Sequence, residues 1–146
     1  MNYTWIKLNR HQLGKYGEYF AKMEFTRAGF DVYTSEVDDK GIDFVIRKNE
    51  SQYYDIQVKS LRNCHYIFSK GRVFESRNNL YIVLILFKED EQPVLLLVPS
   101  SDWKELKKGY LARQNYHYLK SGVILNDEDI HELKDKYGFD KQVKEL

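Results

Sequence analysis

Polar side chains recur at fixed spacing along two expected strands in the stretch GIDFVIRKNESQYYDIQVKS, residues 41–60. Asp43 stands in the first strand, and Asp55, Gln57 and Lys59 alternate with apolar residues in the second. Alternate residues of a strand share a face, so the last three belong to one side of the hairpin. Charge on a strand that packs between helices would need a chemical reason.

The register of this hairpin decides whether its polar groups meet. A three-residue turn at 49–51 pairs Arg47 with Tyr53 and therefore places Asp43 opposite Gln57. Opposed side chains have Cβ atoms about 4.5 to 5.5 Å apart, which is close enough for two oxygens to share one cation. A slip of one residue would abolish the arrangement.

These residue types suit the hydrolysis of a phosphodiester bond. That reaction needs a nucleophilic water, charge to offset the phosphate and stabilisation of the departing oxyanion. A carboxylate-held Mg²⁺ can supply the second and third requirements. Lys59, about 6.6 Å along the strand from Gln57, either places a cation beside the water or acts as a base.

A helix is expected before the hairpin, capped by Asn9 and running to about Ala28. Gly14 and Gly17 lie inside it, beside Glu18. Glycine costs about 1 kcal/mol relative to alanine in a helix, so the pair suggests close approach of another backbone or a ligand. The expected apolar face of this helix comprises Leu13, Tyr16, Phe20 and Met23.

Three motifs in this order resemble those of the PD-(D/E)XK nuclease superfamily: Gly14-x-x-Gly17-Glu18, Gly41-Ile42-Asp43 and Gln57-Val58-Lys59-Ser60. The resemblance covers about residues 10–100. It implies an α/β (mixed α+β) fold with a restriction-endonuclease-like αβββαβ core, in which helices flank a mixed central sheet. It also implies a Mg- or Mn-dependent DNA endonuclease that uses a metal-activated water.

The resemblance implies a role for each motif residue. Asp43 would be the central metal ligand, Gln57 the second and the Val58 carbonyl a third, with Lys59 as the catalytic lysine. Glu18 would be a ligand from the helix, reached directly or through water. Gln57 departs from the usual acid and should weaken Mg²⁺ binding, although branches that cut transposon ends or home introns carry glutamine here. Asp55 either restores that charge or is a solvated residue at the strand end.

Basic and hydroxyl side chains around the hairpin are candidate contacts for nucleic-acid phosphates, although a solvated surface explains the charges equally well. The predicted set is Lys15, Ser60, Arg62, Lys70, Arg72 and Arg77. The tyrosine-rich segment 110–120 could stack on bases, but we favour packing of its rings at the edge of the core.

The remaining pattern predicts further elements. We expect strands at 30–35, 41–47 and 53–61, a hairpin at 65–74, and two nearly continuous apolar strands at 79–87 and 93–99. Helices are expected from Ser100 or Ser101 to about Lys108, and from Asn126 to Gly138 with the stripe Ile130, Leu133 and Tyr137.

Composition limits the classes of function. The chain has 146 residues, 42% of them hydrophobic and 31% charged, which predicts one domain spanning 1–146 with a helical portion from about 100. A net charge of +1 means that any nucleic-acid surface must be local. Cys64 is the sole cysteine, and the four histidines show no i, i+4 pair of a zinc enzyme. Neither a membrane span nor a secretory signal is expected, which favours the cytoplasm.

The leading interpretation is therefore a Mg²⁺- or Mn²⁺-dependent endonuclease acting on DNA. Cutting both strands would require two sites, which predicts a homodimer or larger assembly. One alternative is a decayed nuclease fold that binds nucleic acid or protein without turnover. Another is an α/β interaction domain whose hairpin charges face water.

Overall fold

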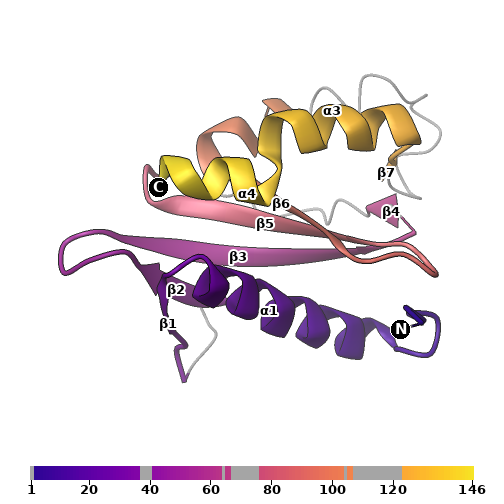
Figure 1. Ribbon diagram of the computed structural model, residues 1–146, viewed down its shortest axis with the longest axis horizontal. Helices are drawn as coiled ribbons and strands as arrows, with labels where there is room; N and C mark the ends of the chain where they lie inside the picture. The colour runs from indigo at the N-terminus through magenta and orange to yellow at the C-terminus, as the bar shows by residue number, and fades with distance from the viewer. Residues whose placement is uncertain (1, 37–40, 64, 67–75, 104, 107–122) are drawn as a thin grey trace.

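A computed structural model describes residues 2–36, 41–63, 65–66, 76–103, 105–106 and 123–146 (Figure 1). The strands are β1 (Asp31–Tyr33), β2 (Phe44–Arg47), β3 (Tyr53–Arg62), β4 (His65–Tyr66), β5 (Leu80–Phe87), β6 (Val94–Pro99) and β7 (Val123–Ile124). The helices are α1 (Arg10–Arg27), α3 (Asp127–Tyr137), the short α4 (Phe139–Gln142) and a 3₁₀ turn η2 (Val143–Glu145). Residues 100–103 and 105–106 are also helical.

The strands form one mixed sheet. β1, β2 and β3 pair antiparallel in sequence, β5 pairs parallel with β3, and β6 pairs antiparallel with β5. β4 and β7 continue the sheet from the end of β3. The predicted mixed sheet flanked by helices is therefore confirmed as an architecture. The helix expected between the third and fourth core strands falls largely on residues outside those described.

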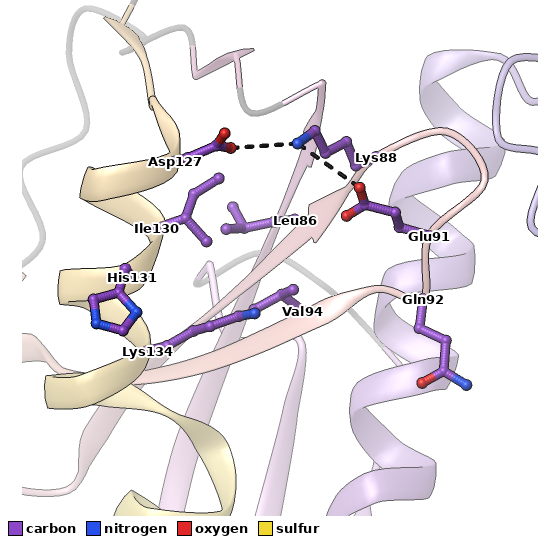
Figure 2. Close-up of a pocket in the computed structure, with 9 residues that line it drawn as sticks. All are labelled: Leu86, Lys88, Glu91, Gln92, Val94, Asp127, Ile130, His131 and Lys134. Carbon is purple, nitrogen blue, oxygen red and sulfur yellow. Dashed lines mark hydrogen bonds and ion pairs between the residues drawn. The ribbon is translucent and has the colours of Figure 1, made fainter.

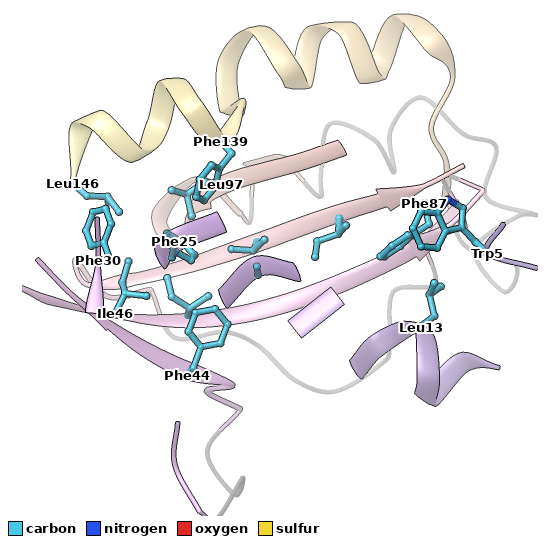
Figure 3. Packing of buried hydrophobic residues seen from close by; sticks show 14 residues of the cluster. Trp5, Leu13, Phe25, Phe30, Phe44, Ile46, Phe87, Leu97, Phe139 and Leu146 are labelled. Atoms are coloured by element: carbon cyan, nitrogen blue, oxygen red, sulfur yellow. The ribbon is translucent and has the colours of Figure 1, made fainter. Parts of the chain in front are cut away.

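Two hydrophobic cores lie on opposite faces of this sheet, because neighbouring residues of β3 and β5 point in opposite directions. α1 covers one face and α3 the other (Figure 1). The α1 core includes Phe25, Phe44, Ile56, Phe87 and Phe139, several of which are labelled in Figure 3. Phe25 and Phe139 meet edge to face with ring centroids 4.9 Å apart, so the C-terminal helix α4 shares the core of α1.

α1 begins and ends where its sequence predicts. Asn9 accepts from the N–H of Gln12 in a full capping box, and Gly29 follows the helix with a φ of +94°. The expected apolar face of this helix is right only in part, because Leu13 is buried and Phe20 packs against the core, but Tyr16 is 38% exposed. The buried stripe is Leu13, Gly17, Ala21 and Phe25, whereas Met23 is 58% exposed. Helix and sheet approach too closely at the middle of this stripe for large side chains.

The remaining elements confirm the pattern with local differences. α3 has the predicted cap at Asn126 and buries Leu133 and Tyr137. β1 and β2 are shorter than expected, and β2 starts at Phe44, so Asp43 precedes the strand. β4 lies within the hairpin expected at 65–74, whereas the short elements β7 and α4 were not predicted. The turn of the hairpin expected at 65–74 and the segment 110–120 lie outside the described residues, which contain no helix able to span a membrane.

Candidate functional site

The register of the β2–β3 hairpin is the predicted one. Arg47 pairs with Tyr53 and Phe44 with Ile56, so the pairing continued by one residue sets Asp43 against Gln57. The turn is closed by the N–H of Lys48, which donates to the carbonyl of Gln52 at 2.9 Å. The hairpin therefore has a closed turn end and, at Asp43, an open end.

At the open end, the Asp43 carboxylate accepts a hydrogen bond from β3 in place of a backbone carbonyl of β2. The N–H of Asp43 donates to the Ile56 carbonyl at 2.9 Å, and its Oδ2 accepts from the N–H of Val58 at 2.6 Å. Val58 lies two residues beyond the last paired residue of β3, where β2 no longer supplies a backbone acceptor. The carboxylate thus touches the peptide bond that joins Gln57 to Val58. In a strand, N–H and C=O of one residue face the same side, so the Val58 carbonyl also faces the open end.

Gln57 carries a buried oxygen without a partner. The residue is only 6% exposed, and among the described residues its Oε1 receives no hydrogen bond. An unsatisfied buried acceptor costs about 1–3 kcal/mol, so the position calls for a donor or a cation. Gln57 and the half-buried Lys59 share the face of Leu61, which is the face opposite α1. The predicted sharing of a face by Gln57 and Lys59 is confirmed.

Glu18 lies on the other side of the sheet. Its carboxylate pairs with the Lys15 ammonium of the same helix at 3.0 Å. The hydrogen bond and charge of Glu18 raise the pKa of Lys15, and the charge of Asp43 adds to that rise. Lys15 therefore lies within electrostatic reach of both carboxylates. The structure brings the Asp43 carboxylate into contact with the Gln57–Val58 peptide, whereas Glu18 pairs with Lys15 on the helix that covers the other face.

The close approach of Ser60 explains why position 17 of α1 is a glycine. A Cβ on Gly17 would lie 2.1 Å from the Ser60 Oγ, so only glycine fits where α1 crosses β3. The predicted close approach is confirmed at Gly17 but not at Gly14, where an added Cβ meets nothing within 4 Å. The Ser60 hydroxyl is buried beneath the helix and has no hydrogen-bond partner in the described part of the chain. It is therefore not on the surface that a phosphate would reach.

Two of the arginines predicted to contact phosphates bind groups of the protein itself. The Arg62 guanidinium donates to the carbonyl of Trp5 at 2.9 Å and to that of Leu8, which ties the N-terminal segment to β3. The Arg77 guanidinium pairs with Asp55 at 2.6 Å. Asp55 is thus committed to a salt bridge rather than to the charge of the open end. Lys70 and Arg72 lie outside the described residues.

Two side chains of α1 adjoin the open end and were not predicted. The Lys22 ammonium lies 5.6 Å from the ring centroid of Phe44, the residue after Asp43, and 5.9 Å from that of Tyr19. Tyr19 follows Lys15 by four residues and Lys22 follows Tyr19 by three, a spacing that would have signalled a common helix face.

Two surface hollows lie away from the open end. One, of about 390 Å³, lies between α3 and the β5–β6 turn, where Lys88 pairs with Asp127 at 3.4 Å and Ile130 faces Leu86 (Figure 2). The other, of about 760 Å³, runs between α1 and α4 and includes Phe20 and Met23. Neither is lined by a predicted site residue. Among the residues described, no three His, Cys, Asp or Glu side chains converge, and the predicted ligand set itself holds only two carboxylates.

Comparison with known proteins adds no relative. No family model matches the chain, and neither the curated proteins nor the solved structures contain a significant match.

Proposed function

We propose that this chain is a metal-dependent nuclease that hydrolyses DNA phosphodiester bonds at the open end of its β2–β3 hairpin. The observation that carries the proposal is the contact of the Asp43 carboxylate with the Gln57–Val58 peptide, together with the buried Gln57 amide oxygen, which has no hydrogen-bond partner among the described residues. On this proposal, the Asp43 carboxylate, the Gln57 amide and the Val58 carbonyl would supply three kinds of oxygen to one ion. A purely structural hairpin would be expected to satisfy such a group with a protein donor.

The donor set suits a hard divalent cation. Asp43, the Gln57 amide and the Val58 carbonyl would hold Mg²⁺ or Mn²⁺ through oxygen alone, as these ions prefer. When bound, the ion would supply charge against the negative charge that develops on the phosphate. Glu18 is paired with Lys15 on α1, so we assign it to the rim of the site.

The protein's own groups account for the rest of the proposal. Lys59 shares the face of Gln57, so its ammonium can orient a water or move a proton beside the scissile phosphate. Lys15 adds a cation on the α1 side. An antiparallel hairpin followed by a parallel strand, with a helix packed across them, agrees with the arrangement that the superfamily resemblance implies. Cutting of both strands would need two such chains.

The test is cleavage of plasmid and branched DNA with Mg²⁺ or Mn²⁺ by the full chain and its variants. Asp43→Asn keeps an oxygen for the Val58 N–H but removes the charge, and Lys59→Met removes the ammonium. Asp31→Asn and Lys7→Met are matched controls at exposed positions. We expect the first pair to lose cleavage by about 100-fold or more and the controls to retain it. Equal cutting by all five proteins would discard the proposal.

A second candidate is a nuclease fold that binds nucleic acid or protein without turnover, favoured by the amide of Gln57 in place of an acid. It predicts binding that is unaffected by metal, together with no cleavage by the native chain. A Gln57→Glu variant that gains both metal binding and cleavage would assign the native site to this second class. Native cleavage that depends on Asp43 would exclude it.

A further inference from the structure

The exposed flank of α1 nearest the open end places one aromatic ring between two cations. Lys15, Tyr19 and Lys22 follow at spacings of four and three residues, which stack on one side of a helix. The two ammonium groups lie 5.7 and 5.9 Å from the Tyr19 ring centroid. Tyr19 is nevertheless 56% exposed, so part of its ring faces solvent.

This group lies beside the proposed site. Lys22 also lies 5.6 Å from the ring centroid of Phe44, and Lys15 is within reach of the charge of Asp43. In the described part of the chain the Lys22 ammonium makes no ion pair. Among the residues that the structure describes, no carboxylate therefore pairs with its positive charge.

An exposed aromatic ring flanked by cations matches the chemistry of a single DNA strand. Bases stack on aromatic rings irrespective of sequence, and lysines bind the phosphates on either side. A base in an intact duplex is already stacked between its neighbours and would not present its face. We propose that Tyr19 is a stacking platform for an unpaired base, with Lys15 and Lys22 binding the adjacent phosphates.

The platform deepens the proposed nuclease function, since it rests on that function for its place beside the reaction. It names the substrate class as DNA with a single-stranded stretch at the cut, such as a flap, a branch or a melted end. The binding itself does not depend on catalysis and can be measured without metal.

The test uses the full chain in EDTA with fluorescein-labelled single-stranded and duplex oligonucleotides of equal length, read by anisotropy. Tyr19→Ala should weaken binding to the single strand by about 5- to 150-fold, the range for loss of one stacked base. Tyr19→Phe should retain binding, because the ring and not the hydroxyl does the stacking. Tyr53→Ala is the control, since Tyr53 is 50% exposed and has no lysine or arginine over its ring in the described residues.

Two further readouts distinguish stacking from charge. Quenching of a 2-aminopurine base in the oligonucleotide should occur with the native chain and Tyr19→Phe but not with Tyr19→Ala. Lys15→Gln and Lys22→Gln should each reduce the slope of log binding constant against log salt by about 0.7, the value for one phosphate of a single strand. Lys7→Gln should leave that slope unchanged.

The outcomes separate the two proposals. Single-strand binding by Tyr19→Ala equal to that of the native chain would overturn the platform, as would equal loss in Tyr19→Phe and Tyr19→Ala. If Tyr19→Ala weakens binding while Asp43→Asn still cuts, the nuclease assignment fails and the platform stands. If Asp43→Asn stops cutting while Tyr19→Ala binds normally, the platform alone fails.

Discussion

The two ends of the β2–β3 hairpin treat their polar groups differently. At the turn end, the Asn49 Oδ1 accepts from the N–H groups of Ser51 and Gln52, at 3.0 and 2.9 Å. At the open end, the Asp43 carboxylate replaces a backbone acceptor, and the buried Gln57 Oε1 receives no hydrogen bond within the described part of the chain. One end therefore holds a satisfied polar network and the other an unsatisfied one.

This difference separates stability from function within one short element. A satisfied side-chain cap lowers the free energy of the folded chain and needs nothing else. An unpaired buried oxygen raises that free energy, and it persists where a ligand can complete it. The comparison predicts that changes at the turn end alter stability alone, whereas changes at the open end alter activity or the response to metal.

The largest difference is expected between two lysines, one near each end. Lys59→Gln should reduce cleavage of plasmid DNA by about 100- to 10,000-fold, because the proposed function has the ammonium act on the reacting groups. Lys48→Gln should leave the cleavage rate unchanged, since Lys48 donates to the carbonyl of Leu146 at the turn end. Initial rates under saturating Mn²⁺ would measure both. A loss of similar size in Lys48→Gln would break the comparison.

The next largest effect, a change in stability, is expected where α1 packs against β3. Gly17→Ala would set a Cβ 2.1 Å from the Ser60 Oγ and should lower the free energy of unfolding by about 1–3 kcal/mol. Gly14→Ala meets nothing within 4 Å and should raise that free energy by up to about 1 kcal/mol through helix propensity. Urea unfolding followed by circular dichroism would measure both.

A second substitution checks the cause of this loss. Ser60→Ala in the Gly17→Ala background removes the clashing oxygen and should recover much of the stability. No recovery would show that the Ser60 Oγ is not what limits the approach of the helix.

Substitution of Gln57 should change the free energy of unfolding in opposite directions without and with metal. Gln57→Leu removes the unpaired oxygen, so without metal the free energy of unfolding should rise by about 1 kcal/mol. With Mn²⁺ at 100 times its Kd, the native chain should gain about 2.7 kcal/mol, a gain that the variant loses. Thermal unfolding with EDTA and with Mn²⁺ would show both signs. Equal stabilisation of the two proteins by Mn²⁺ would remove Gln57 from the site.

The smallest effect belongs to the turn end. Asn49→Ala removes the acceptor of two backbone N–H groups and should lower the free energy of unfolding by about 1 kcal/mol. DNA cleavage per folded molecule should not change. Urea unfolding and a cleavage assay on the same preparation would test this, and a selective loss of cleavage would contradict the separation of the two ends.

The sequence predicted those features that depend on local spacing. The alternation of residues along the strands and the short turn placed Asp43 opposite Gln57. Capping residues located the ends of α1 and α3. The contact of the Asp43 carboxylate with the Val58 N–H was not predictable, because it depends on where β2 leaves the ladder.

The buried face of α1 was missed for a different reason. A search for large apolar side chains selected Tyr16, Phe20 and Met23, whereas the helix lies so close to Ser60 that Gly17 and Ala21 face the sheet. Spacing shows which residues share a helix face, but the distance between helix and sheet decides which face is buried. The flank with Tyr19 and Lys22 was passed over for the same reason.

The most direct test of the open end as a cation site is calorimetric titration of the native chain and of Asp43→Asn with Mn²⁺. Saturable binding to the native chain that disappears in Asp43→Asn, while Asp31→Asn binds as the native chain does, is the predicted result. Identical binding heats in the native chain and Asp43→Asn, or none in the native chain even with a non-cleavable DNA strand present, would contradict the account.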